Sequence, residues 1–222
     1  MHKHISQNKK AYNAIAGKFS DTREFLWDDL KGLERYAKDG DTVLDIGCGN
    51  GRLYQLFQDM QVHYTGIDQS SELIAIAKKR FPDLRFIVSE MTDMAIQSNS
   101  ADIIYAIASF HHLPTIELRV KALEEMKRLL KPQGKIVMLN WNLMSNWARK
   151  KYTSTNGNDF FIPWKDGKGN ILETRYYHSF LLEDLHDLAE AAGLEIIEQH
   201  YIKKGKVSSI GPGENILTVL TS

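Results

Sequence analysis

Apolar residues along the chain follow two spacings, one typical of buried strands and the other of amphipathic helices. Short runs rich in β-branched residues predict strands over 42–46, 62–67, 84–88, 101–106 and 135–140. Helical spacing fills intervals between them, and it predicts helices over 71–80 and 115–130. Strands that alternate with helices predict a parallel, doubly wound α/β sheet that binds its ligand at the carboxyl edge.

The two ends of the chain extend this pattern. Residues 7–38 are predicted to be helical in two pieces, separated by a break with capping candidates Ser20 and Asp21. Such an N-terminal segment can pack against the sheet or lie over the ligand as a lid, and the sequence supports both interpretations. At the other end, a predicted helix over 181–192 is followed by two closing strands over 194–202 and 215–221.

A glycine-rich turn after the first predicted strand carries the strongest chemical signal. Residues 43–51 read VLDIGCGNG, with three glycines at alternate positions. Apolar residues at helical spacing over 53–57 follow and predict a helix after the turn. Because glycine has no Cβ, such a turn brings backbone N–H groups close to a ligand. A dinucleotide fingerprint would need its third glycine at position 52, which is Arg52. Asp45 at the end of the strand suits a ligand that carries an ammonium group and would repel a pyrophosphate.

A second acidic residue lies where nucleoside-binding proteins place one. Asp68 ends the second predicted strand and follows Asp45 by 23 positions, close to the offset of about 20 residues in nucleoside-binding βαβ units. A carboxylate there can accept hydrogen bonds from both hydroxyls of a ribose. The other interpretation is a helix N-cap, but Ser70 already supplies the cap for the helix over 71–80. We therefore expect Asp68 to bind a ribose.

Composition narrows the class of protein further. With 222 residues, 43% of them hydrophobic and 25% charged, the chain suits one soluble globular domain. It has no run of about 18 apolar residues and no apolar signal-peptide core, so we expect no membrane partner and a cytoplasmic location. The single cysteine, Cys48, excludes an internal disulfide and a cysteine-based metal site. Zero formal net charge argues weakly against a large nucleic-acid footprint.

The later part of the chain holds two further features. The neighbours His111 and His112 cannot both face one point from a helix, so we expect no metal site there. Residues 142–180 form an insertion before the last helix, in which aromatic residues alternate with Arg, Lys and His. This mixture can stack an unpaired base and hold its phosphates, or it can be a locally packed flap with solvated charges.

Six short segments, spread over nearly the whole chain, form a specific combination. They are residues 11–16 with 19–23, 45–51, 110–113, 139–141, 161–165 and 175–178. On these segments the chain resembles the class I S-adenosylmethionine (SAM) methyltransferases. Within that class it is similar to the tRNA wobble-uridine carboxymethyl methyltransferases, which comprise the yeast-type enzyme and a domain fused to an AlkB-like oxygenase in animals. The glycine motif is common to the class, whereas FIPWK at 161–165 and RYYH at 175–178 are specific to this branch.

The resemblance implies a fold, a reaction and a set of site residues. The fold is Rossmann-like, with a seven-stranded, mostly parallel sheet, helices on both faces and an antiparallel last strand. One domain covers 1–222, with an N-terminal helical lid over 1–40 and a substrate-side insertion over 142–180. The expected cofactor is SAM, without a metal. The expected partners are tRNA and a small zinc-containing activator protein.

Residue roles follow from the same resemblance. The adenine amino group would be received by Glu90, with Met91 packed on the ring. The residues expected to bind the cofactor are Tyr12, Arg23, Asp45, Gly47, Cys48, Gly49, Asn50, Asp68, Gln69, Glu90, Met91, Ala106 and His111. The candidates for positioning the acceptor are Arg23, His111, Trp141, Trp164, Arg175, Tyr177 and His178. No residue is assigned as a general base, because an acceptor carboxylate is already ionised at neutral pH and is itself the nucleophile.

Two other functions remain open at this point. A methyltransferase for a small quinone, phenol or short acid would have a closed apolar pocket, and the histidine pair would supply a base for a phenol. A SAM-binding partner subunit without catalysis would bind the cofactor and turn over no acceptor. The glycine spacing nearly excludes a nicotinamide oxidoreductase.

Overall fold

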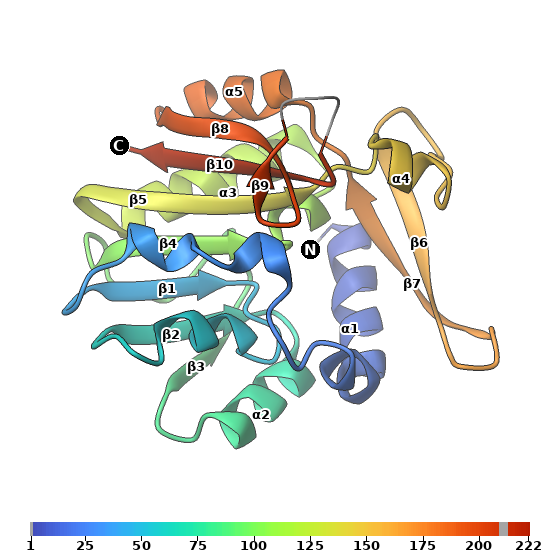
Figure 1. The fold of residues 1–222 in the computed structure, drawn as a ribbon, viewed down its shortest axis with the longest axis horizontal. Coiled ribbons are helices and arrows are strands. Elements are labelled where there is room, and N and C mark those ends of the chain that lie inside the picture. Colours follow the sequence, from blue (N-terminus) through green and yellow to red (C-terminus); the bar gives the residue numbers. More distant parts are fainter. Residues whose placement is uncertain (1, 209–212) are drawn as a thin grey trace.

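A central eight-stranded sheet forms the middle layer of the computed structural model, which describes residues 2–208 and 213–222 (Figure 1). The strands lie in the order β3-β2-β1-β4-β5-β10-β8-β9. Their bounds are β1 (Thr42–Ile46), β2 (His63–Asp68), β3 (Arg85–Val88), β4 (Ala101–Ile107), β5 (Leu130–Trp141), β8 (Glu195–Lys203), β9 (Lys206–Val207) and β10 (Asn215–Thr221). Strands β3, β2, β1, β4 and β5 pair in parallel, and β10 pairs antiparallel with both β5 and β8. The predicted parallel sheet with an antiparallel last strand is confirmed, and β9 is a short additional edge strand.

Helices cover both faces of the sheet. They are α1 (Lys3–Asp21), α2 (Ser71–Arg80), α3 (Ile116–Leu129), α4 (Asn146–Arg149) and α5 (Leu182–Ala191). Leu44 and Ile46 of β1 point into the core beneath α3 and α5, whereas Val43 points into the core that contains Ile74 of α2. The alternation along β1 thus buries both faces of this strand, as its continuous apolar composition predicts.

Two segments predicted as helical form short 3₁₀ turns. The second N-terminal piece consists of turns at Asp28–Leu30 and Leu33–Tyr36, because Gly32 lies between them with a φ of 87° that an α-helix cannot accommodate. The segment after the glycine turn likewise forms a 3₁₀ helix, Arg52–Phe57. The helices predicted over 71–80, 115–130 and 181–192 are found within a residue of their expected bounds, whereas α1 begins at Lys3, four residues before the predicted start.

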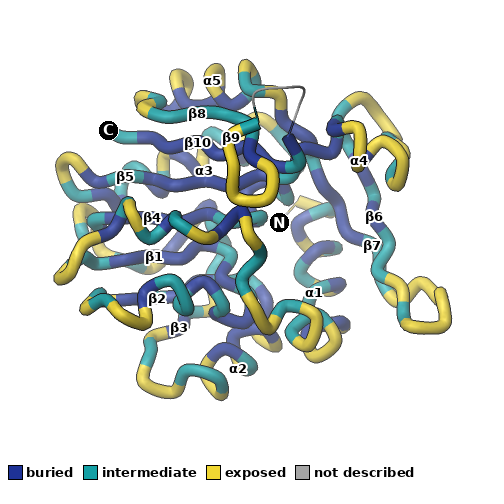
Figure 2. The backbone as a smooth tube through the Cα atoms, in the orientation of Figure 1, coloured by how far each residue is buried: buried dark blue, intermediate teal, exposed yellow. Residues whose placement is uncertain are grey.

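A separate hairpin stands beside the sheet and against α1 (Figure 1). It consists of β6 (Asp159–Lys165) and β7 (Ile171–His178), and lies within the predicted insertion. The buried side chain of Asn8 fastens it to α1: its Nδ2 donates to the Tyr176 carbonyl at 2.9 Å, and its Oδ1 accepts from the Tyr176 N–H at 2.7 Å. Figure 2 shows that the base of the hairpin is buried and that its far end is exposed.

The parallel register brings the ends of β1, β2, β3 and β4 to one edge of the sheet. Helix α1 and the hairpin lie beyond this edge (Figure 1). Within residues 2–208 and 213–222, no helix is both long enough and apolar enough to cross a lipid bilayer.

Candidate active site

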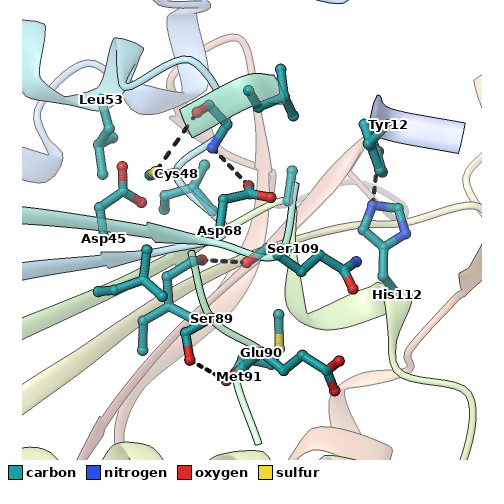
Figure 3. Close-up of a pocket in the computed structure, with 18 of the residues that line it drawn as sticks. Tyr12, Asp45, Cys48, Leu53, Asp68, Ser89, Glu90, Met91, Ser109 and His112 are labelled. Carbon is teal, nitrogen blue, oxygen red and sulfur yellow. Dashed lines mark hydrogen bonds between the residues drawn. The ribbon is translucent and has the colours of Figure 1, made fainter. Parts of the chain in front are cut away.

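A cavity opens at the carboxyl edge of the sheet, where doubly wound α/β sheets bind their ligands. It is lined by α1, by the glycine turn after β1, and by the residues that follow β2, β3 and β4. Figure 3 shows Asp45 at one end of this view, the hydrogen-bonded pair Tyr12 and His112 at the other, and Asp68 between them. Segments distant in sequence therefore supply different parts of one elongated cavity.

The glycine turn is held tightly beneath the cavity. Gly47 has a φ of 79°, and a Cβ added to it would lie 2.2 Å from the Cβ of Ser109. The Ser109 hydroxyl in turn donates to the Ile46 carbonyl at 2.7 Å. The N–H groups of Gly47 and Cys48 donate to the Ile67 carbonyl at 2.7 and 3.0 Å. Glycine is required at position 47 for both its backbone conformation and the space it leaves.

Asp68 faces the cavity with part of its hydrogen-bonding capacity unused. Its Oδ2 accepts from the Gly49 N–H at 2.9 Å, and its Oδ1 accepts from the Ser70 N–H at 2.8 Å. Burial raises the pKa of this carboxyl, and the backbone donors oppose that shift. Each oxygen keeps a lone pair, so the two can accept hydrogen bonds from a vicinal diol.

Asp45 is buried at the other side of the glycine turn. The Tyr64 hydroxyl donates to its Oδ2 at 2.5 Å. Burial raises the pKa of Asp45 to about 7, with the Tyr64 hydrogen bond opposing this shift and the charge of Asp68 adding to it. A ligand cation beside Asp45 would offset the desolvation of the carboxylate, lower its pKa and return it to its ionised form.

Most residues expected to bind the cofactor line this cavity. They are Tyr12, Asp45, Gly47, Cys48, Gly49, Asn50, Asp68, Gln69, Glu90 and Met91. Three others lie outside the lining: Ala106 is buried within β4, His111 is buried behind His112, and Arg23 lines a second cavity. Phe19, Arg52 and Ser109 also line the cavity, although they were not among the predicted site residues. Only Arg52 had a local signal, because it directly follows the glycine turn.

His112 has a defined tautomer, set by its two neighbours. Its Nδ1 lies 2.8 Å from the Tyr176 carbonyl, which only accepts, so Nδ1 carries the proton. Its Nε2 therefore accepts from the Tyr12 hydroxyl at 2.9 Å. Burial lowers the pKa of His112 to about 3, which keeps the ring neutral at physiological pH.

His111 is neutral as well and is placed differently. Its Nδ1 accepts from the Trp141 N–H at 3.2 Å, which leaves the proton on Nε2. That buried N–H has no acceptor among the residues that the structure describes. Burial lowers the pKa of His111 well below its usual range. The rings of His111 and His112 lie 4.7 Å apart and nearly perpendicular, so they present different faces, as expected for neighbours.

A buried arginine lies beside this histidine pair. The Arg175 guanidinium lies 5.0 to 5.6 Å from the ring centres of Trp164, Tyr177 and Tyr12, which we call the arginine box. Arg175 is only 4% exposed, yet it makes no ion pair with any acidic residue in the described parts of the chain. Its Nε is buried and lacks an acceptor there too. A buried, unpaired cation enclosed by aromatic rings is a receptor for an anion.

The other predicted acceptor-side residues divide into two groups. Trp141 stacks on Tyr177 with ring centres 5.3 Å apart and an angle of 13° between the planes, so it lies directly next to the arginine box. His178 lies apart, with its Nδ1 2.7 Å from Asp159 Oδ1, which also accepts from the Tyr176 hydroxyl. This cluster at the base of the hairpin fastens β7 to β6.

Comparison with known proteins places the chain among methyltransferases. A family model described as a methyltransferase domain matches residues 44–138. The tRNA (carboxymethyluridine(34)-5-O)-methyltransferase of Schizosaccharomyces pombe is 29% identical over 210 residues, covering 86% of this chain and 90% of that protein. The Mus musculus tRNA (carboxymethyluridine(34)-5-O)-methyltransferase ALKBH8 is 34% identical over 149 residues, covering 67% of this chain but only 21% of that protein. A chain of the complex between the Haloferax volcanii Trm112 methyltransferase activator and a putative methyltransferase shares the fold, with a TM-score of 0.71 at 20% identity over 96% of each chain.

The fold, the glycine turn with its two carboxylates, and these matches identify the chain as a SAM-dependent methyltransferase. Within this class it resembles the tRNA carboxymethyluridine methyltransferases.

The residues of the first cavity suit SAM. Three carboxylates, from Asp45, Asp68 and Glu90, line it against one guanidinium, that of Arg52, which favours a ligand with a net positive charge. The buried Oε1 of Gln69 also lacks a donor among the described residues, and a bound nucleoside can supply one. Among those residues, no cluster of three or more His, Cys, Asp or Glu side chains is placed to hold a metal ion.

The raised pKa of Asp45 predicts that SAM binding depends on pH. Only the ionised carboxylate attracts the ligand's ammonium group, and the ionised fraction falls as pH falls below about 7. The affinity measured by titration calorimetry should therefore rise by about tenfold from pH 5.5 to pH 7, a range in which the ammonium stays protonated. Asp45→Asn should bind SAM weakly and without this dependence. An unchanged pH dependence in that variant would assign the titration to another group.

Proposed function

We propose that this protein transfers the methyl group of SAM to the carboxylate of 5-carboxymethyluridine at the wobble position of tRNA, which forms a methyl ester. The observation that carries the proposal is the unpaired, buried guanidinium of Arg175 beside the cofactor cavity. The names of the fission yeast and mouse relatives support the same acceptor. A small apolar acceptor would leave this buried charge without a partner.

The residues of the site have distinct tasks in this reaction. Bound at the glycine turn, with its ribose at Asp68 and its amino group at Asp45, SAM supplies an electrophilic methyl group. Arg175 holds one acceptor carboxylate by charge-assisted hydrogen bonds, and the surrounding rings exclude water from the pair. The carboxylate oxygen would bond to the methyl carbon as the bond from that carbon to sulfur breaks, and S-adenosylhomocysteine would be the product that leaves. The carboxylate loses no proton in this step, so no general base is needed. The imidazoles of His111 and His112 form part of the wall beside Arg175. Because their lowered pKa values keep both rings neutral, Arg175 supplies the positive charge there.

The two segments beyond the sheet edge would enclose the acceptor. Residues 1–40 serve as a lid, because Tyr12 and Phe19 of α1 line the cofactor cavity. Residues 142–180 provide the acceptor side through Trp164, Arg175 and Tyr177. We further propose that the protein acts on cytoplasmic tRNA and associates with a small activator protein, which the activator complex of the structural neighbour supports.

The pH profile separates this acceptor from a phenol. A carboxylic acid with a pKa near 4 is ionised throughout pH 6 to 8, and His112, with a pKa of about 3, does not titrate in that range. At saturating SAM, kcat for 5-carboxymethyluridine in tRNA should therefore vary by less than about twofold between these pH values. A rise of about tenfold per pH unit would instead indicate a hydroxyl acceptor that must lose its proton.

A further inference from the structure

A second cavity lies next to the cofactor cavity. Its wall is formed by residues that follow α1 and by residues at and after the end of β5. Residues just before β9 and at the start of β10 also contribute to this wall. Arg52 lines both cavities. Trp141 also lines the second cavity and stacks on Tyr177 of the arginine box. The second cavity is therefore adjacent to the place where the acceptor would bind.

Four aromatic side chains contribute to the wall of the second cavity. Trp27, Trp141, Trp147 and Phe25 all line it. Phe25 is 74% exposed and Trp147 is 47% exposed, although they come from segments far apart in the sequence. Large apolar side chains that gather on a surface mark a binding site rather than a packed core. Trp27 adds a buried Nε1–H without an acceptor in the described chain.

The acidic residues of this wall are all engaged within the protein. Asp28 pairs with Lys31 at 2.8 Å, and Glu214 pairs with Lys203 at 3.0 Å. Asp29 accepts from the Gly205 N–H at 2.5 Å and from Asn215 Nδ2 at 2.6 Å. These partners offset the negative charge that the carboxylates would otherwise present to a ligand.

The cations of the same wall have no such partners. Arg23, Arg52 and Lys204 line the cavity, and none of them forms an ion pair with a residue in 2–208 or 213–222. Arg52 lies over the Trp27 ring at 4.2 Å and so covers one face of it. Just outside, Lys151 lies 5.1 Å from the Trp147 ring. The unpaired charge that remains around the cavity is positive.

We infer that the second cavity binds the unpaired nucleotide that flanks the acceptor uridine. Its base would stack on Trp147 and Phe25, and its phosphate would lie at Arg23 and Lys204. Stacking on aromatic rings combined with cations for the phosphate is how proteins hold single-stranded RNA. That the occupant is RNA rests on the proposed function, and the arrangement explains how a chain of zero net charge binds tRNA locally.

Two acceptors of different size test this inference. Fluorescence anisotropy gives the Kd of a labelled anticodon stem-loop RNA that carries 5-carboxymethyluridine, and a tritium-transfer assay gives kcat/KM for the stem-loop and for the free nucleoside. Trp147→Ala should weaken stem-loop binding by about 5- to 100-fold, as expected for one lost stacking contact. Transfer to the free nucleoside, which does not reach the second cavity, should stay within about twofold. Phe25→Ala should act in the same direction, whereas the matched control Ile171→Ala, an exposed residue of the hairpin, should change neither.

The outcomes separate this inference from the proposed function. Wild-type affinity for the stem-loop in both Trp147→Ala and Phe25→Ala would overturn the inference and leave the cavity to a protein partner. Equal losses for nucleoside and stem-loop would also overturn it, because the cavity would then hold the acceptor itself. A wild-type protein that binds the stem-loop but methylates neither acceptor would refute the proposed function, and the effect of Trp147→Ala on Kd would still decide the inference. Absence of stem-loop binding by the wild-type protein would overturn the inference.

Discussion

Replacing Arg175 by methionine should lower kcat/KM for the carboxymethyl acceptor by about 100-fold or more. A charge-assisted hydrogen bond contributes about 1.5–3 kcal/mol, and a carboxylate can accept two of them from one guanidinium. Methionine retains the apolar stem that packs among Tyr12, Trp164 and Tyr177, so the box should keep its shape. Because Arg175 has no acidic partner among the described residues, its removal leaves no buried carboxylate unpaired there.

Two controls make the Arg175 result specific. SAM affinity, measured by calorimetry, should stay within about twofold of the wild type, and the melting temperature should not fall. Arg175→Lys should recover only part of the activity, because a lysine offers a point charge instead of a planar fork. Full activity in Arg175→Met would show that the carboxylate binds elsewhere, and an equal loss of SAM affinity would assign Arg175 to the cofactor.

Gly47→Ala should destabilise the protein by about 3 kcal/mol and abolish measurable SAM binding. The new Cβ would lie 2.2 Å from the Cβ of Ser109 and 2.7 Å from its hydroxyl, and the φ of 79° is strained for alanine. Overpacking costs about 1–3 kcal/mol, and a left-handed conformation adds about 1 kcal/mol or more. Relief of the clash would move the end of β4 or the glycine turn, and both line the cofactor cavity.

Gly17→Ala provides a matched control of opposite sign. Gly17 lies inside α1, and a Cβ there would have no neighbour within 4 Å. Alanine should stabilise this helix by about 0.5–1 kcal/mol. Urea unfolding of both variants measures the difference. If Gly47→Ala were as stable as Gly17→Ala and still bound SAM, the tight packing of the turn against Ser109 would not be needed.

Much of the cofactor side could be predicted because its signals are local. The glycine turn follows the end of one strand, and Asp45 and Asp68 lie at the ends of two neighbouring strands. A parallel sheet brings these strand ends to one edge. Other outcomes depended on contacts that sequence spacing does not encode. Gly32 interrupts the second N-terminal helix, and the 3₁₀ turn at Phe110–His112 directs His112, rather than His111, into the cavity.

The acceptor side was harder to predict because its residues meet across the fold. The Tyr12 hydroxyl reaches His112, and Arg175 on the hairpin reaches Tyr12 on α1. The family resemblance indicated Arg175 as a candidate, but the burial and the unpaired charge of Arg175 result from the packing of the hairpin. The residues that line the second cavity come from five separate parts of the chain, and no single segment predicts it.

The most direct test of the proposed function is the chemical form of the transferred methyl group. The protein, with any activator it requires, is incubated with tritiated SAM and bulk tRNA from a strain that lacks this methyltransferase activity, and the labelled tRNA is then treated with mild alkali. The proposal predicts label on the tRNA that alkali releases, because a methyl ester is hydrolysed under these conditions. Label that resists alkali would place the methyl group on carbon, nitrogen or a ribose oxygen, and would contradict the proposed carboxylate acceptor.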